Sequence, residues 1–334
     1  MVNAVDFAGR PFHFIGVGGI GMSALAYILA QKGFQVSGSD VRPNHITHKL
    51  ESIGVNFFGK QEPSNLEFFN VDSSPQVVCS TAINASNLEY KAALEKGCPI
   101  FHRSDILAAL ISQYKSIAVA GTHGKTTTSS MIGYMLLQAG VDPTIIVGGE
   151  VKAWEGNARL GQSPYLVAEA DESDGSLVKH SPEIGIITNI ELDHPDHYDT
   201  LDEVVNIFKT FTNQCKTVVA CIDCGNVNER FQPDISYSLS PDSGADYYAT
   251  NIDYRADGTT ALVWEKGIAL GVLNLAVLGH HNLSNALAAV AIGRMLGLEF
   301  GEIARGLATF EGARRRFEFR GEVDGITFID DYAH

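Results

Sequence analysis

The stretch SIAVAGTHGKTTT, residues 116–128, decides the fold of this chain. Its first five residues are mostly apolar and predict a buried strand, and the residues from Thr126 onwards predict a helix over residues 126–139. Between them lies a glycine-containing turn that ends in Lys125. A turn of this composition between a strand and a helix is the context of a phosphate-binding loop. The sequence therefore predicts a P-loop-type α/β domain around these residues.

The residues of this loop indicate how it would bind a nucleotide. Main-chain amides would surround the phosphates, Lys125 would reach the outer phosphates, and the Thr126 hydroxyl would bind magnesium. The loop is shorter than the general pattern, because Val119 stands where that pattern has its first glycine. A glycine-rich turn that binds no nucleotide is the alternative. The loop residues predicted to bind the nucleotide are Gly121, Thr122, His123, Gly124, Lys125, Thr126 and Thr127.

Strand and helix patterns alternate on both sides of the loop, which predicts parallel sheets. From Asp246 onwards, short alternating segments joined at Asp257-Gly258 and Lys266-Gly267 predict antiparallel hairpins. We therefore predict an N-terminal Rossmann-like parallel-sheet domain over residues 1–112. A central P-loop-type ATP-binding α/β domain, with an added antiparallel hairpin region, is predicted over residues 113–321.

The charge and composition of the chain limit the classes of partner and the cellular location that we expect. The 334 residues include 24 Lys and Arg against 39 Asp and Glu, a net charge of −15, which disfavours a nucleic-acid partner because such binding depends on basic clusters. The sequence has neither an apolar run long enough to cross a membrane nor a signal-peptide pattern at its start. Its five cysteines are odd in number and scattered, as expected for reduced thiols. We expect a soluble, cytoplasmic protein with no nucleic-acid or membrane partner.

A second glycine-rich turn, GVGGIG at residues 16–21, also lies between a predicted strand and a predicted helix. Asp40 follows about 20 residues later at the end of the next strand, as in dinucleotide-binding folds. The glycines would let the backbone approach a diphosphate, and the start of the helix would attract its negative charge. NAD and a UDP-sugar both carry such a diphosphate. A tight turn without a ligand is the alternative.

Polar residues follow two further predicted strands. The run EADESD, residues 169–174, places four carboxylates after the first strand, and TNIELDHPDH, residues 188–197, follows the second. Because carboxylate oxygens suit Mg²⁺, we predict that the first run, residues 169–174, supplies a magnesium ligand. His194 is predicted as a ligand of a second metal or as a substrate contact, and His197 as a surface residue. A solvated acidic loop is the alternative.

The run HHN at residues 280–282, together with Asn285, opens a later predicted helix. Its imidazole and amide groups could contact the base or ribose of a nucleotide. Capping of the helix by Asn282 explains the same residues equally well.

Taken in their order along the chain, these motifs resemble the Mur ligase family. The resemblance rests on the first glycine turn followed by Met22-Ser23, GTHGKTTT at residues 121–128, EADESD, TNIExDH, HNxxNA from His281, and the final DDYAH at residues 330–334. It spans nearly the whole chain and implies a UDP-sugar domain, a central ATP domain and a C-terminal domain that helps to bind an amino acid. Because the sequence stops within its last motif, we expect a truncation, with residues 322–334 as the start of the third domain.

The resemblance also implies roles for individual residues. The catalytic set would be Lys125, Glu169 and His194, and magnesium would be held by Thr126, Glu169 and His194. The UDP-sugar diphosphate would be contacted by Gly18, Gly19 and Gly21, with Ser80, His102 and Arg103 as further candidates in that domain. ATP would be contacted by His281, Asn282 and Asn285 near adenine, by Arg316 at a phosphate and by Asp331 near the ribose.

The activity implied by the resemblance is the joining of L-alanine to the carboxylate of UDP-N-acetylmuramic acid in peptidoglycan synthesis, with ATP and Mg²⁺. The γ-phosphoryl group would pass to the carboxylate, and the alanine amine would then displace phosphate from the acyl phosphate. Without most of the third domain, we expect the chain to bind its ligands but to turn them over poorly, because the reactants would be badly positioned.

Three alternatives stay open at this point. An NAD-dependent dehydrogenase would explain the first glycine turn but not the phosphate loop and its acidic run. A related ligase that joins murein tripeptide to the same UDP-sugar would fit most motifs, but its glycine loop departs from the form of residues 18–23. A module that only binds nucleotide and sugar would also fit. The oligomeric state and the base that deprotonates the amine are not predicted.

Overall fold

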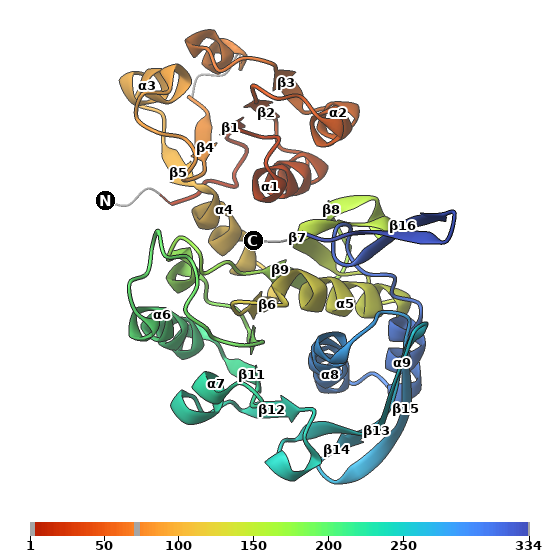
Figure 1. Cartoon of the computed structure of the whole chain (residues 1–334). Helices are drawn as coiled ribbons and strands as arrows, with labels where there is room; N and C mark the ends of the chain where they lie inside the picture. Colours follow the sequence, from red (N-terminus) through yellow and green to blue (C-terminus); the bar gives the residue numbers. More distant parts are fainter. Residues whose placement is uncertain (1–3, 70–73, 333–334) are drawn as a thin grey trace. The chain divides into compact units, whose positions relative to one another are not determined.

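The computed structural model describes residues 4–69 and 74–332 and divides into two compact units (Figure 1). The first unit takes the described residues up to Gln113 together with Gly156–Leu160. The second takes Tyr114–Glu155 and the described residues from Gly161 onwards. The segment Gly156–Leu160, which includes strand β8 (Gly156–Arg159), therefore belongs by its contacts to the first unit although it lies far along the chain.

The first unit is a parallel sheet with flanking helices. Its strands are β1 (Phe12–Ile15), β2 (Val36–Ser39), β3 (Asn56–Phe58), β4 (Gln76–Cys79) and β5 (Ile100–His102). Its helices are α1 (Ile20–Gln31), α2 (His45–Ser52), the short 3₁₀ helix η1 (Pro63–Glu67), α3 (Leu88–Glu95) and α4 (Arg103–Ile111). The strand order β3-β2-β1-β4-β5, with every pair parallel, follows the 3-2-1-4-5 order of dinucleotide-binding folds. The predicted Rossmann-like parallel sheet is therefore confirmed.

A polar network lies buried within the first unit. His13 on β1 and Glu89 on α3 are both 0% exposed, and His13 Nε2 lies 2.8 Å from Glu89 Oε1. The other ring nitrogen of His13 lies 2.6 Å from Ser37 Oγ on β2. Glu89 also accepts hydrogen bonds from Ser39 Oγ and from Asn65 Nδ2. Because these groups are removed from water, their mutual hydrogen bonds are needed to offset the cost of burial, and they join β1, β2, η1 and α3.

The second unit is built around one large sheet. Its strands are β6 (Lys115–Ala120), β7 (Thr144–Val151), β9 (Tyr165–Glu169), β10 (Ile184–Ile187), β11 (Thr217–Cys221), β12 (Ile235–Ser238), β13 (Tyr247–Arg255), β14 (Gly258–Glu265) and β15 (Ile268–Leu275). Its helices are α5 (Lys125–Gln138), α6 (Leu201–Gln214), α7 (Gly225–Arg230), α8 (His280–Met295) and α9 (Phe300–Ala308), with 3₁₀ turns η2 (Lys152–Trp154), η3 (Ser176–Lys179) and η4 (Pro241–Ser243). The order β15-β14-β13-β12-β11-β10-β6-β9-β7 is parallel from β13 to β7.

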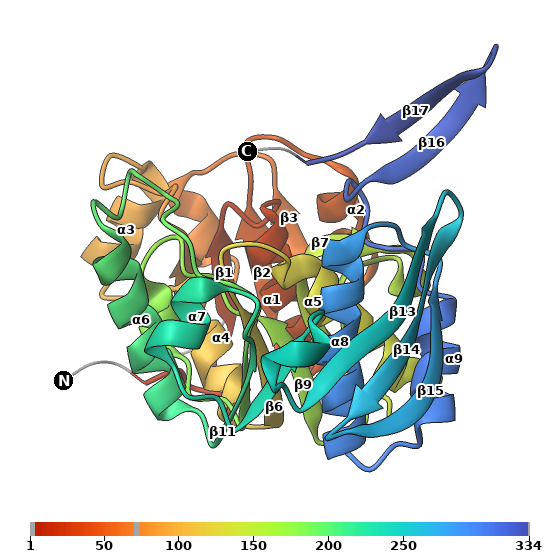
Figure 2. The ribbon, with the colours of Figure 1, turned by 60° about the horizontal axis from the view of Figure 1, so that its bottom comes forward.

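Strand β6 is buried on both faces of this sheet, as its apolar run predicts. Ile117 and Val119 belong to the core shared with α5, α8 and α9, whereas Ala118 and Ala120 belong to the core shared with α6 and α7. Figure 2 shows α8 and α9 on one side of the sheet and α6 and α7 on the other. The alternation follows from the two-residue period of a strand, and covering both faces is what a parallel sheet requires.

The antiparallel region predicted after Asp246 is confirmed, because β13, β14 and β15 pair antiparallel. The turn at Lys266-Gly267 is as predicted, and both residues have positive φ, 48° and 81°. The first turn lies one residue earlier than predicted, at Ala256-Asp257, because Gly258 already starts β14.

A last hairpin, β16 (Glu318–Val323) with β17 (Ile326–Asp330), contains the predicted boundary at residue 321. A domain that began at residue 322 would divide β16, so the third domain would have to begin no later than Glu318. The domain division itself stays a prediction. Within residues 4–69 and 74–332, no helix is long and apolar enough to cross a membrane.

We predict that Glu89→Ala destabilises the chain by about 3–5 kcal/mol, because it leaves several buried partners without their acceptor. The matched control is Glu95→Ala at an exposed position of the same helix, which should change the free energy of unfolding by less than about 0.5 kcal/mol. Urea unfolding followed by circular dichroism measures both. Equal stabilities of the two variants would show that the network contributes little.

Candidate active site

The phosphate loop between β6 and α5 is attached to the residues that follow β10. Thr188 Oγ1 donates to the carbonyl of His123 at 2.6 Å, and the His123 amide donates to Asn189 Oδ1 at 2.8 Å. Gly121 has φ 141°, and a Cβ there would lie 2.0 Å from Thr188 Oγ1. Only glycine therefore fits at this position, because a side chain would meet both backbone strain and a steric clash. The loop has one well-defined shape before any nucleotide binds.

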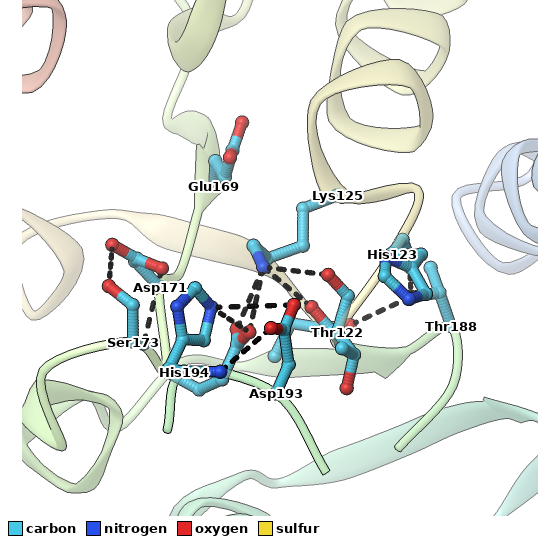
Figure 3. A network of polar contacts seen from close by, with 12 residues as sticks. Thr122, His123, Lys125, Glu169, Asp171, Ser173, Thr188, Asp193 and His194 are labelled. Atoms are coloured by element: carbon cyan, nitrogen blue, oxygen red, sulfur yellow. Dashed lines mark hydrogen bonds and ion pairs between the residues drawn. The ribbon is translucent and has the colours of Figure 1, made fainter. Parts of the chain in front are cut away.

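Lys125 is surrounded by acceptors at the centre of the site (Figure 3). Its Nζ donates to the Gly121 carbonyl at 2.7 Å and lies 2.9 and 3.0 Å from the two carboxylate oxygens of Glu172. The Thr122 carbonyl is a further acceptor at 3.3 Å. Glu172 is 1% exposed, and burial raises its pKa to about 7 against the opposing effect of the Lys125 charge. The predicted phosphate-binding lysine is thus paired with a buried carboxylate.

Thr126 and Glu169, two of the predicted magnesium ligands, lie together. Thr126 Oγ1 donates to Glu169 Oε1 at 3.2 Å, and the Gly148 amide donates to Glu169 Oε2 at 2.7 Å. Burial raises the pKa of Glu169, with the Lys125 charge acting in the opposite direction. A Cβ at Gly148 would lie 2.6 Å from Glu169 Oε1, so a side chain there would displace the carboxylate from its present position. Among the described residues, no three His, Cys, Asp or Glu side chains are grouped closely enough to hold a metal by themselves.

His194, the third predicted ligand, lies on the Glu172 side of the site. Its Nε2 is 3.5 Å from Glu172 Oε1 and 4.0 Å from Asp193 Oδ2. The residue has φ 56°, and its amide donates to Asp193 Oδ1 at 2.7 Å. The hydroxyl of Tyr198, four residues on, donates to the main-chain carbonyl of Glu172. The structure thus groups His194 with Glu172, and its role as a metal ligand stays a prediction.

The start of α8 lies beside the phosphate loop. A Cβ placed on Gly124 would be 2.9 Å from Asn285 Oδ1, which locates this predicted adenine contact next to the loop. Asn282 Nδ2 donates to the Leu278 carbonyl at 2.8 Å. The N-cap of α8 is Gly279, so the alternative that Asn282 caps the helix is wrong. Burial and the neighbouring His280 lower the pKa of His281, while Asp331 opposes this.

Arg316, the predicted phosphate contact, also reaches the loop, since its Nη2 lies 3.5 Å from Thr126 Oγ1. The Tyr332 ring lies 5.5 Å from the Arg316 guanidinium and 5.0 Å from that of Arg315. Asp331 Oδ1 accepts a hydrogen bond from the Phe317 amide at 3.0 Å, which attaches the end of β17 to the segment that carries Arg316. Arg316 thus contacts the loop, and Asp331 and Tyr332 contact the segment that carries Arg316.

The glycine turn of the first unit is held by a hydrogen bond to Asp40. The Gly18 amide donates to Asp40 Oδ2 at 2.9 Å, and the other Asp40 oxygen accepts from the Arg42 amide at 2.9 Å. Asp40, expected from the dinucleotide pattern, thus bonds the turn itself. A Cβ on Gly21 would lie 3.6 Å from Arg103 Nη1, so these two predicted contacts are neighbours.

The other candidates of the first unit have structural contacts. Gly19 is the N-cap of α1, and His102 is the N-cap of α4, where its Nδ1 accepts from the Ser104 amide at 3.3 Å. The Ser80 carbonyl accepts from the Ile83 amide at 3.0 Å. Roles of Gly19, Ser80 and His102 in binding a UDP-sugar stay predictions.

Two family models match this chain. The model described as "Mur ligase family, catalytic domain" matches residues 11–115, and "Mur ligase middle domain" matches residues 119–293. The chain belongs to the Mur ligase family. The resemblance based on the motifs is therefore confirmed, and with it the α/β fold class.

This Mur ligase is similar to curated and solved members of the family. It is 76% identical, over all of its length and 72% of the relative's, to the UDP-N-acetylmuramate–L-alanine ligase of Nostoc punctiforme. Its fold matches the crystal structure of UDP-N-acetylmuramate-alanine ligase MurC from Thermotoga maritima with a TM-score of 0.86, at 29% identity over 97% of this chain and 74% of that one. A murein peptide ligase from Psychrobacter arcticus matches with a TM-score of 0.83, at 26% identity over 98% of this chain and 73% of that one.

Several residues of the site in this Mur ligase were not predicted individually from the sequence. Glu172 lies within the acidic run, but nothing local distinguishes it from Asp171 or Asp174. Asn189 and Gly148 belong to the site through contacts with the phosphate loop and with Glu169. Asp171, Glu172 and Asp174 all follow the end of β9, so their place after a strand locates the run at this sheet edge but does not single out Glu172.

We predict that Gly121→Ala weakens ATP binding at least about tenfold, because the new methyl group displaces Thr188 and strains the loop. Gly225→Ala is the control in the same unit, since a Cβ there meets nothing within 4 Å. Isothermal titration calorimetry measures both affinities. An unchanged affinity of Gly121→Ala would contradict a role of this loop in phosphate binding.

Proposed function

We propose that this chain carries the nucleotide-binding and UDP-sugar-binding parts of an ATP-dependent ligase that joins L-alanine to UDP-N-acetylmuramic acid in peptidoglycan synthesis. The observation that carries the proposal is the cluster at the carboxyl ends of β6, β9 and β10. There Lys125 and Thr126 of the phosphate loop lie beside the acidic run, and Thr126 bonds Glu169. Its support is the 76% identity to a relative that bears this activity in its name. A cytoplasmic location, as predicted from the sequence, is part of the proposal.

The chemistry follows from the charges at this edge. A carboxylate oxygen of the muramic acid attacks the γ-phosphorus of ATP, and ADP leaves with the electron pair of the broken bond. The alanine nitrogen then attacks the acyl carbon, phosphate leaves with the oxygen that carried it, and the nitrogen loses a proton. Lys125 and Arg316 would stabilise the negative charge on the phosphoryl oxygens, which is where catalysis of phosphoryl transfer mainly acts.

The residues present fit a magnesium ion. The Thr126 hydroxyl and the Glu169 carboxylate are hard oxygen donors 3.2 Å apart, beside the loop that would bring phosphate oxygens. When bound, the ion would neutralise charge on those oxygens. The raised pKa of Glu169 reflects burial of a group whose ionised form gains from a nearby cation. We propose Thr126 and Glu169 as the ligands from this chain, with His194 as a candidate for a second position.

The remaining roles are proposed on the same basis. Asn285, His281 and Asn282 at the start of α8 would contact adenine, with Asp331 near the ribose. In the first unit, Gly18, Gly19 and Gly21 would face the diphosphate of the UDP-sugar, with Arg103 as its cationic neighbour.

A ligase that uses murein tripeptide instead of alanine is the second candidate. The backbone does not separate the two, because the solved murein peptide ligase fits this fold nearly as well as the alanine ligase. The glycine loop of residues 18–23 and the high identity to a named alanine ligase favour alanine. The dehydrogenase alternative leaves the phosphate loop without a role.

We predict alanine-dependent release of phosphate from ATP when UDP-N-acetylmuramic acid is present. The assay compares this chain with a version extended to the length of the Nostoc punctiforme relative, of which this chain covers 72%. Turnover is expected mainly in the extended protein, and Lys125→Ala should lower it at least about a hundredfold. Release with tripeptide but not alanine would support the second candidate. No release with this sugar in either protein would contradict the proposal.

We also predict that Glu169→Gln raises the Mg²⁺ concentration needed for half-maximal ATP binding roughly tenfold, because one charged ligand is lost. Asp174→Asn is the control from the same acidic run, since its carboxylate accepts a hydrogen bond from the Ser176 amide. Titration of Mg²⁺ at fixed ATP measures the shift. Equal Mg²⁺ requirements of the two variants would exclude Glu169 as a ligand.

A further inference from the structure

We propose that Glu172 is a positioning residue that binds Lys125 in the nucleotide-free protein and releases it to the phosphates when ATP binds. The inference rests on the proposed function, because it assumes that the loop binds ATP. It adds a competition inside the protein that sets the affinity for the nucleotide.

The hydrogen-bond capacity of Lys125 supports this competition. An ammonium group has three donors. In this structure its nitrogen is within bonding distance of the Gly121 carbonyl, the Thr122 carbonyl and both oxygens of Glu172. All three donors can be used by the protein, so a phosphate oxygen can bond Lys125 only by replacing one of these acceptors. The carboxylate is the acceptor most like a phosphate in charge and geometry.

Glu172 is held in place by more than this ion pair. It is 1% exposed, and its main-chain carbonyl accepts a hydrogen bond from Tyr198, which is itself only 5% exposed. The main chain is therefore fixed, and release of Lys125 requires rotation of the Glu172 side chain alone. His194 is a second cation-forming group beside it, with Nε2 3.5 Å from Glu172 Oε1. A released Glu172 can pair with His194, which connects nucleotide binding to the segment after β10.

The effect on the affinity for ATP distinguishes a Glu172 that competes with phosphate for Lys125 from a Glu172 that only orients Lys125. Breaking a buried pair costs free energy, and ATP must supply that cost from its own contacts. Removal of the Glu172 charge removes the cost in advance and leaves the lysine without its carboxylate until phosphate arrives. The affinity for ATP should therefore rise although a contact is lost. If Glu172 only kept Lys125 correctly oriented, its loss would lower the affinity.

The test is calorimetric binding of ATP without Mg²⁺ at about pH 8, where an isolated carboxylate is ionised. Glu172→Gln, which preserves shape and removes the charge, is expected to bind ATP about tenfold more tightly than the wild type. Asp171→Asn removes a charge from the same run, at a carboxylate that accepts a hydrogen bond from the Ser173 hydroxyl, so a change within about twofold is expected. An equal rise in both variants would mean that only general charge matters and would overturn the proposal.

Thermal unfolding provides a second measurement. Glu172→Gln should unfold at a lower temperature than the wild type without ATP, and saturating ATP should raise its midpoint by more than it raises that of the wild type. A purely structural role would lower the first value without enlarging the second. If the glutamine variant does not fold, Glu172→Asp keeps the charge at a shorter reach and should bind ATP with an affinity above that of the wild type.

Tighter binding with a larger ATP-dependent rise supports the proposal, and unchanged or weaker binding by Glu172→Gln or Glu172→Asp overturns it. Failure of the wild-type chain to bind ATP at all would overturn the proposed function as well, so the two failures are distinguishable.

Discussion

The parallel pairing of β6 with β9 on one side and β10 on the other is the constraint on which the site depends. Val119 lies opposite Glu169, and Ala120 lies opposite Ile187, so the three strands end at the same level of the sheet. Parallel strands place their carboxyl ends at one edge. The parallel pairing alone therefore brings together the phosphate loop, the acidic run and the segment after Ile187. Both faces of β6 are covered by helices, so a one-residue slip would exchange the Ile117 and Val119 face with the smaller Ala118 and Ala120 face and disturb both cores.

Charge balance at this edge explains much of the side-chain arrangement. Glu169 and Glu172 are three residues apart in the acidic run, and burial raises the pKa of both carboxyl groups. Lys125, at the end of the phosphate loop, is the cation that pairs with Glu172. A buried carboxylate and a buried ammonium are each costly alone, and pairing them offsets part of that cost. Lys125, the proposed phosphate contact, is consequently the centre of the ion pairing at this edge.

In the first unit, hydrogen bonds within the chain hold the glycine turn. Its glycine turn is shaped from within, because Asp40 accepts hydrogen bonds from the amides of Gly18 and Arg42. The start of α1 is also contacted by a distant part of the chain, since Asn157 Nδ2 donates to Ser23 Oγ at 3.1 Å and to the Ile20 carbonyl. Asn157 lies in the segment Gly156–Leu160, which follows the phosphate loop in the sequence. Folding of the turn is thus linked to residues more than a hundred positions later.

The sequence by itself determined the α/β class, the two glycine turns, the antiparallel hairpins and the family, because these depend on periodicity, glycine positions and ordered short motifs. It also singled out Lys125 and Thr126 from the phosphate loop, and Glu169 through the family resemblance, as candidates whose roles stay predictions. Only the tertiary structure decided that Glu172 binds Lys125, that Asp40 bonds its own turn, and that Arg316 reaches Thr126. The physical reason is that burial and ion pairing are set by which surfaces pack together, so carboxylates that look alike in the run EADESD differ once one of them is enclosed beside a lysine.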